Sequence, residues 1–208
     1  MKKIIASLLI LISVLSVFCA CSKKDDKTPT KLDGLTSGYT GDVKIEQGVK
    51  IENLEIVLGK YIFTVNGVRF RYKDFEKTPK RTAQLGEFKM DLYVKDSALK
   101  KCILRKTNSI GRTVYCALFN PDGKAYDYYK YEYDDFGNIT CRMHYDKDGK
   151  LESFFTAEYD EKTQNQSAKY LYDNRYRLKE VIKYTYNENS KLVSTAYYDA
   201  KGNLKKTA

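Results

Sequence analysis

The chain has 208 residues, a formal net charge of +10 and 19 tyrosines, but only one histidine. A single histidine excludes a multi-histidine metal centre. The positive charge is spread along the chain rather than gathered in one block. It therefore favours encounters with anionic glycans, lipid headgroups or nucleic acid without selecting among them.

The N-terminal stretch "MKKIIASLLILISVLSVFCACS" has the order of a secretory signal peptide, with two lysines, an uncharged apolar run and small residues. The run from Ile4 to Phe18 is shorter than the roughly 20 residues of a membrane-spanning helix. The segment "FCACS" resembles the lipobox of bacterial lipoproteins, which implies cleavage after residue 20 and lipidation of Cys21. Acyl chains on Cys21 would then anchor the protein to a membrane of the bacterial cell envelope. A secreted protein with two stray cysteines is the alternative.

Residues 21–41 are charged and rich in Thr, Gly and Ser, which predicts a flexible tether. Lys24-Asp25-Asp26 resembles the export signal of surface lipoproteins in Bacteroidetes. That resemblance implies the outer membrane, although its outer surface and its periplasmic face both stay open. Removal of residues 1–20 leaves 35 basic and 27 acidic residues, or about +8. Nucleic acid is the least expected anionic partner of a secreted protein.

Residues 42–99 are expected to form a smaller N-terminal β region. The stretch "KYIFTVNGVRFRY", residues 60–72, predicts a hairpin that turns at Asn66-Gly67. "EFKMDLYV", residues 87–94, alternates as a further strand. We expect residues 75–86 to form a loop or one short helix between them.

Residues 100–208 contain a repeat in which an aromatic residue precedes a turn every 12 to 14 residues. Asp or Asn opens each turn by bonding to its own backbone, and Gly supplies a positive φ. Where Gly is missing, Tyr176 and Ser190 take its place and looser turns are expected. The aromatic residues are Phe119, Tyr133, Tyr145, Tyr159, Tyr172, Tyr186 and Tyr198.

The segments between the turns are rich in Tyr, Phe, Val, Ile and Thr, as strands are. We predict an all-β fold: an antiparallel meander of about eight repeat strands, either a curled sheet or an open barrel, packed on residues 42–99. The mostly even spacing predicts one apolar face and one solvent face. The odd interval from Tyr159 to Tyr172 predicts a bulge or a wider loop. The apolar face is expected to include Cys141, Met143, Tyr145, Leu151, Phe155, Ala157, Leu178, Ile182 and Tyr184.

The turn phrase Tyr-Asp-x-x-Gly resembles the YD, or Rhs, repeat of bacterial surface proteins, with the best fits at residues 133–137 and 198–202. The short MORN-type repeat, with Tyr and Asn-Gly-Lys, is a similar match. Repeats of the YD family form curling β-sheets that act as shells or stalks. Neither resemblance implies a reaction.

The mature chain would keep Cys102, Cys116 and Cys141, an odd number that leaves at least one thiol unpaired within the chain. A hairpin that turns at residues 107–111 would place Cys102 roughly opposite Cys116. A disulfide between them and buried free thiols are both open.

The sequence shows no converging catalytic residues, and we expect no cofactor and no metal. His144 is expected on the solvent face, which leaves a histidine-based triad without support. The stretch from Asp146 to Gly149 begins like a calcium loop but lacks the later acidic ligands. Paired glycosidase carboxylates would have to come from acids that resemble ordinary surface residues: Asp127, Glu132, Asp134, Asp135 and Glu158.

Tyrosine is the unusual resource of the sequence, because it offers contact area, a π-face for sugar rings and a polar tip. Tyr126 and Tyr128 are expected outside the main apolar stripe and are the predicted ligand contacts. We expect a noncatalytic binding or scaffolding module for a glycan, an envelope polymer or a protein, and a polyanion is a further candidate partner. An antitoxin-like or immunity partner protein and a polymer hydrolase are the alternatives.

Overall fold

The computed structural model describes residues 28–36, 38–50 and 52–208. The predicted signal peptide, Cys21 and the Lys24-Asp25-Asp26 segment lie outside these residues. Within the described residues, no helix has the length and hydrophobicity needed to cross a membrane.

The described chain forms two antiparallel sheets. The small sheet has the order β1-β2-β3 and is followed by the 3-10 helix η1 (Tyr72–Phe75). The large sheet contains 11 strands in chain order from β4 to β14. The strands are β1 (Ile56–Leu58), β2 (Ile62–Val65), β3 (Val68–Arg71), β4 (Lys80–Leu85), β5 (Phe88–Lys95), β6 (Ala98–Thr107), β7 (Thr113–Phe119), β8 (Ala125–Tyr133), β9 (Ile139–Tyr145), β10 (Leu151–Tyr159), β11 (Gln166–Asp173), β12 (Leu178–Tyr186), β13 (Leu192–Asp199) and β14 (Leu204–Thr207).

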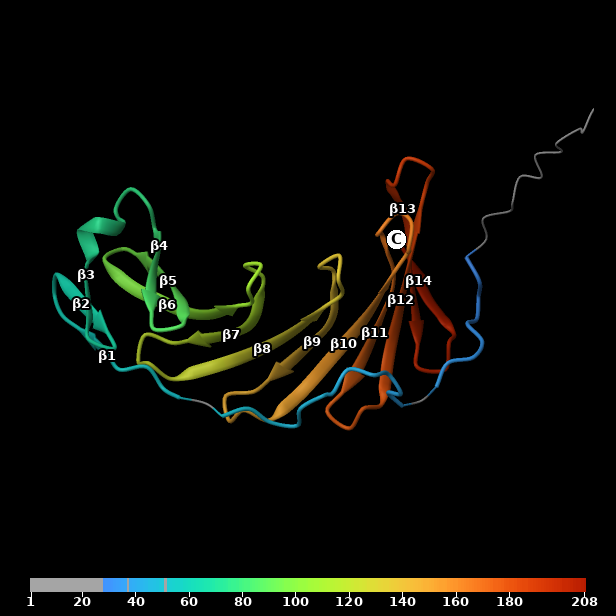
Figure 1. Ribbon diagram of the computed structural model, residues 1–208, viewed down its shortest axis with the longest axis horizontal. Helices are drawn as coiled ribbons and strands as arrows, with labels where there is room; N and C mark the ends of the chain where they lie inside the picture. Colours follow the sequence, from blue (N-terminus) through green and yellow to red (C-terminus); the bar gives the residue numbers. More distant parts are fainter. Residues whose placement is uncertain (1–27, 37, 51) are drawn as a thin grey trace, which may run out of the picture.

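The large sheet bends into an open curl and does not close, because β4 and β14 lie at its two ends (Figure 1). The predicted all-β meander is therefore confirmed, as a curled sheet rather than a closed barrel. The predicted hairpin at Asn66-Gly67 corresponds to β2 and β3. The large sheet also includes β4 and β5, so residues 80–99 belong to the same sheet as the repeats.

The turns share one hydrogen-bonding pattern. Asp146 accepts bonds from the backbone N–H groups of Asp148 and Lys150 through its side chain, and Gly149 has a φ of +75°. Tyr176 and Ser190 take the glycine place with φ of 61° and 58° and donate the same backbone bond as Gly149. The prediction of looser turns at these two positions is therefore wrong.

The expected wider loop after Tyr159 is confirmed. Its closing bond joins the N–H of Asp160 to the carbonyl of Asn165, whereas the neighbouring turns close one residue earlier. Gln164 adopts the positive φ in this turn. The odd interval in the sequence thus corresponds to one inserted turn residue.

A strap formed by the described residues of the range 28–54, which are 28–36, 38–50 and 52–54, runs along the outer side of the curl, next to every second turn (Figure 1). Its backbone N–H groups donate to the carbonyl of the positive-φ residue in four alternate turns. The described part of the predicted tether is therefore bonded to the sheet rather than free. The pairs are Leu32 with Gly202, Tyr39 with Tyr176, Val49 with Gly149, and Leu54 with Gly123, at 2.8 to 3.0 Å.

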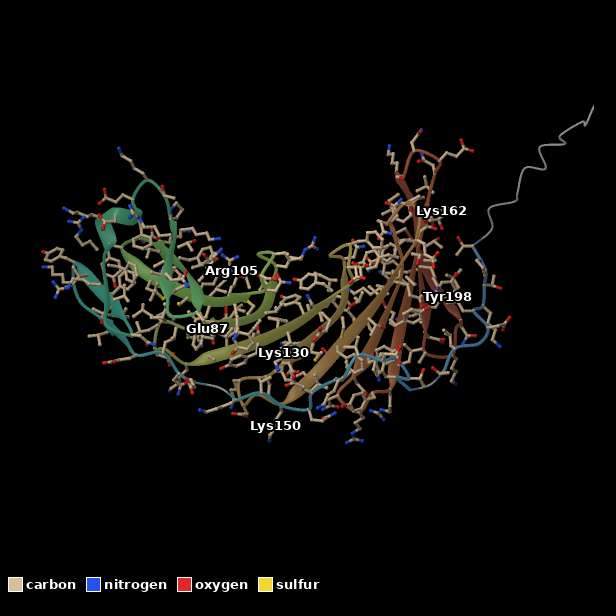
Figure 2. The ribbon with its side chains drawn as sticks, viewed as in Figure 1. Glu87, Arg105, Lys130, Lys150, Lys162 and Tyr198 are labelled. Atoms are coloured by element: carbon tan, nitrogen blue, oxygen red, sulfur yellow. The ribbon has the colours of Figure 1, made fainter. Side chains whose placement is uncertain are left out.

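The main core lies between the large sheet and the elements on its outer side, which are the strap and the small sheet. We call this side of the large sheet the strap face and the other side the open face. Tyr198 is buried on the strap face and donates to the carbonyl of Pro29, whereas Arg105 lies on the inner side of the curl (Figure 2). Further core residues of the strap face include Cys102, Tyr128, Cys141, Met143, Tyr145, Leu151 and Phe154.

The face of a side chain depends on a register shift next to the turns. Between β9 and β10 the shift lies at Leu151 to Ser153, with Glu152 as the extra residue. Residues beyond each shift therefore change face relative to a simple period of two. Phe154 and Val181 are buried on the strap face, while Phe155 and Tyr184, predicted there, lie on the open face.

The three described cysteines are free thiols. Cys102 pairs in register with Phe119, and Cys116 pairs with Arg105 three residues further along β6. With no register shift between these positions, the two thiols lie on opposite faces of the sheet. The predicted placement of Cys102 opposite Cys116 is wrong.

Candidate functional site

A cavity of about 1070 Å³ lies between the strap, the turn from β4 to β5, and the strap face of β6 to β8. These segments, together with Asn66 in the turn from β2 to β3, supply its walls. The residues that line it are Glu46, Gly48, Val49, Lys50, Glu52, Asn53, Leu54, Asn66, Leu85, Gly86, Glu87, Phe88, Leu104, Lys106, Val114, Tyr115, Phe119, Lys130, Tyr131 and Glu132.

Aromatic and aliphatic side chains form part of the wall. The rings of Phe88 and Tyr115 meet edge to face with centroids 6.1 Å apart, and Phe119 and Leu104 are buried beside them. Burial raises the pKa of the Tyr115 hydroxyl to about 12. Tyr115 thus stays a neutral hydrogen-bonding group at ordinary pH.

Charged residues form the rest of the wall. Lys106 pairs with Glu87 at 2.6 Å, and Lys130 on β8 pairs with Glu46 of the strap. Figure 2 shows Glu87 and Lys130 toward the outer side of the curl, where the strap runs. Glu132 has no ion-pair partner among the described residues, so its carboxylate is available to a ligand.

This arrangement is suited to a polyhydroxylated ligand. Aromatic rings offer flat apolar surfaces, and the carboxylates, the amide groups of Asn53 and Asn66, and the lysines accept or donate hydrogen bonds to hydroxyl groups. A cavity of this size lies slightly above the ~300–1,000 Å³ typical of small-ligand sites.

The five candidate catalytic acids do not converge. Only Glu132 lines the cavity, where the other carboxylates come from Glu46, Glu52 and Glu87. Asp127 bonds to His144 on the open face, and Asp134 bonds to Asn138 within its turn. Across the described ranges, no group of three or more His, Cys, Asp or Glu side chains is placed to hold a metal.

The two predicted contact tyrosines are not part of the cavity. Tyr128 is completely buried in the core, so its ring is closed to a ligand, and its hydroxyl has no hydrogen-bond partner among the described residues. The prediction that Tyr128 lies outside the apolar stripe, where it could contact a ligand, is therefore wrong. Tyr126 is partly exposed and is the extra residue of the register shift at the start of β8.

His144 is less exposed than a surface residue. Its side chain is 23% exposed, stacks on Tyr129 with centroids 4.8 Å apart, and bonds through Nε2 to Asp127 at 2.8 Å. Its Nδ1 lies 3.3 Å from Glu152. His144 is thus held on the open face by two carboxylates and one ring.

Sequence reasoning missed the cavity because part of its wall is the strap, and nothing in the sequence indicates that the strap lies beside the β4–β5 turn and β6 to β8. One signal was present in Lys106, Lys130 and Glu132, which place charges on the face that carries the core of the sheet. Charged residues on a buried face indicate an opening in it or a ligand.

No protein-family model matches the chain, and no curated protein matches it. Some solved structures resemble part of it. TarM has a TM-score of 0.25 at 8% identity, covering 51% of this chain and 22% of that chain. A mutant of TarM from S. aureus has a TM-score of 0.24 at 8% identity, covering 52% and 23%. The GtfA/B complex has a TM-score of 0.27 at 13% identity, covering 71% and 28%. The chain thus spans less than a third of each of these proteins, and likenesses at this level carry no argument about function.

Proposed function

We propose that the protein is a noncatalytic binding module of the bacterial cell envelope, anchored to the outer membrane by lipid on Cys21, and that its ligand is a neutral glycan held in the cavity. The observation that carries the proposal is the cavity itself, lined by Phe88, Tyr115 and Glu132, whose carboxylate has no ion-pair partner among the described residues. Sugar rings pack against aromatic side chains, and their hydroxyl groups bond to carboxylates and amides.

The signal-like start of the sequence supports the cellular location in this proposal. A ligand of the envelope would then meet the protein on its own membrane. The YD and MORN-type repeats that the turn motif resembles imply a scaffold rather than a reaction, which agrees with a binding role.

The test uses residues 22–208, which lack the signal segment and Cys21, on an array of neutral glycans, followed by calorimetry with the best ligand. We expect Glu132→Gln to weaken binding about tenfold or more, as the loss of a hydrogen bond to a charged group would. Glu161→Gln is the matched control, because Glu161 is exposed in the loop between β10 and β11. Binding by the Glu161→Gln variant should equal that of the parent.

Two results would contradict the proposal. If no neutral glycan binds, or if Glu132→Gln and Glu161→Gln behave alike, the cavity is not a glycan site. Release of shorter products from the bound glycan, abolished by Glu132→Gln, would instead identify a hydrolase.

A further inference from the structure

Two cations flank one aromatic ring on the open face. The guanidinium carbon of Arg142, on β9, lies 4.9 Å from the ring centroid of Phe155, and Nζ of Lys169, on β11, lies 4.0 Å from the same centroid. Phe155 belongs to β10, which lies between these two strands in the sheet. The two positive charges are thus close together on the inner side of the curl.

Neither cation has a carboxylate partner among the described residues. Nε of Arg142 is buried and also lacks a hydrogen-bond partner. Two acids near the neighbouring His144, Asp127 and Glu152, contact that histidine instead. Arg105, on the same face, differs because it pairs with Asp91 at 2.7 Å.

The surroundings of Lys169 are apolar. Lys169 is partly buried, and in register it stands beside Ala157 and Ile182, both 9% exposed. Burial, followed by the charge of Arg142, lowers the pKa of Lys169. Two like charges in a partly desolvated place destabilise each other unless an anion compensates them.

We propose that Arg142 and Lys169 form a binding site for the oxyanion groups of an acidic polysaccharide. The planar guanidinium group can donate two parallel hydrogen bonds to a pair of oxygens on a carboxylate, phosphate or sulfate ester, and the ammonium group supplies a second charge. Tyr129 and Tyr131 stand beside Arg142 on β8 and offer ring surfaces to the sugars next to the anion. The site lies on the opposite face of the sheet from the cavity and does not depend on the function proposed for the cavity.

The test measures binding of residues 22–208 to dextran sulfate, polygalacturonate and a phosphorylated dextran, with neutral dextran as the uncharged probe. We expect at least one acidic polymer to bind, and Arg142→Gln and Lys169→Gln each to weaken that binding tenfold or more. The polymer that binds best identifies the anion as sulfate, carboxylate or phosphate.

Lys206→Gln is the matched control. Lys206 stacks over Tyr197 at 4.3 Å on the open face, so its replacement removes the same charge and the same kind of contact. This variant should bind within twofold of the parent. Equal losses in all three variants would reduce the interaction to net charge and overturn the site, as would the failure of every acidic polymer to bind.

A second measurement guards against variants that misfold. The Lys169 ammonium group can be titrated by NMR in the unmodified chain, and a saturating acidic polymer should raise its pKa. No change in that pKa on binding would place the polymer elsewhere. Glu132→Gln should leave this binding intact, which separates the site from the cavity.

Discussion

The backbone N–H of Leu32 donates to the carbonyl of Gly202 at 2.8 Å, which joins the start of the described chain to its last turn. A Cβ atom at Gly202 would lie 2.3 Å from the carbonyl oxygen of Leu32. At Gly123 a Cβ atom would lie 1.9 Å from the oxygen of Leu54. These two glycines are therefore required both by their positive φ and by the closeness of the strap.

Replacement of Gly202 by Ala should separate these two requirements when compared with Gly111→Ala. Gly111 has a φ of +82° but no atom near a Cβ, so its replacement should cost only the backbone term, roughly 1–2 kcal/mol. Gly202 has a φ of +81°, and the Cβ of an alanine there would in addition have to displace the strap. The loss of stability in Gly202→Ala should therefore be larger by about 1 kcal/mol or more. Urea unfolding at pH 7 measures both. Equal losses would show that the strap yields freely.

Tyr176 occupies a glycine position for the sake of its side chain. Its hydroxyl donates to the carbonyl of Ile45 at 3.1 Å, and its ring meets Phe154 edge to face at 5.6 Å. Tyr176→Gly should relieve the backbone but lose these contacts, for a net destabilisation of about 2 kcal/mol.

Ser190→Gly is the control for that variant. Ser190 has a similar φ of 58° but is exposed, so the change should be neutral or stabilise by less than about 1 kcal/mol. Thermal unfolding of both variants distinguishes the two cases. A stabilising Tyr176→Gly change would mean that the ring contributes nothing to the strap.

The sequence predicted the turns better than the faces. Local chemistry determines a turn, so Asp146 and Gly149 could be recognised in isolation. The face of a strand residue depends on the extra residue at each register shift, and Glu152 carries no local sign of that role. For this reason the sequence predicts Phe155 on the core face and Tyr128 outside it, whereas Phe155 lies on the open face and Tyr128 is buried in the core.

The strap and both candidate sites could not be predicted for a related reason. A segment such as residues 28–54, which lacks apolar periodicity, gives no indication that its backbone pairs with turns far away in the sequence. The closeness of Arg142 to Lys169 likewise needs the registers of β9, β10 and β11 together. The repeat indicates the turns and the order of the strands, but not these contacts.

Asp91 should make stability depend on pH. It is almost fully buried, which alone would raise its pKa, but hydrogen bonds from Thr82, Arg105 and Lys80 outweigh burial and hold the pKa below its ordinary value. A carboxyl group with a depressed folded-state pKa adds stability above its unfolded pKa of about 3.9, and this stability is lost as the pH falls through the folded value.

Asp91→Asn should therefore lower the free energy of unfolding by about 2 kcal/mol at pH 7. This is less than the loss expected on breaking a fully buried ion pair, because Lys80 and Arg105 are partly exposed. The difference from the parent should shrink as the pH is lowered below about 4. Urea unfolding from pH 7 to pH 2.5 measures it, with Asp135→Asn, an exposed turn residue, as the control. A difference that does not vary with pH would exclude the ionised carboxylate as its source.

The three thiols should resist modification in the folded protein. Burial raises the pKa of Cys102 and of Cys141 to about 12 and that of Cys116 to about 11. Because the thiolate is the reactive form, all three should react with a disulfide reagent at pH 8 far more slowly than an ordinary thiol with a pKa of about 8.5. Residues 22–208 contain only these thiols, so the reaction can be counted directly. A Ser109→Cys variant, exposed in the turn from β6 to β7, should react at the ordinary rate, and guanidinium should release the other three. A fast thiol in the unmodified chain would show that the sheet opens near that cysteine far more often than its burial allows.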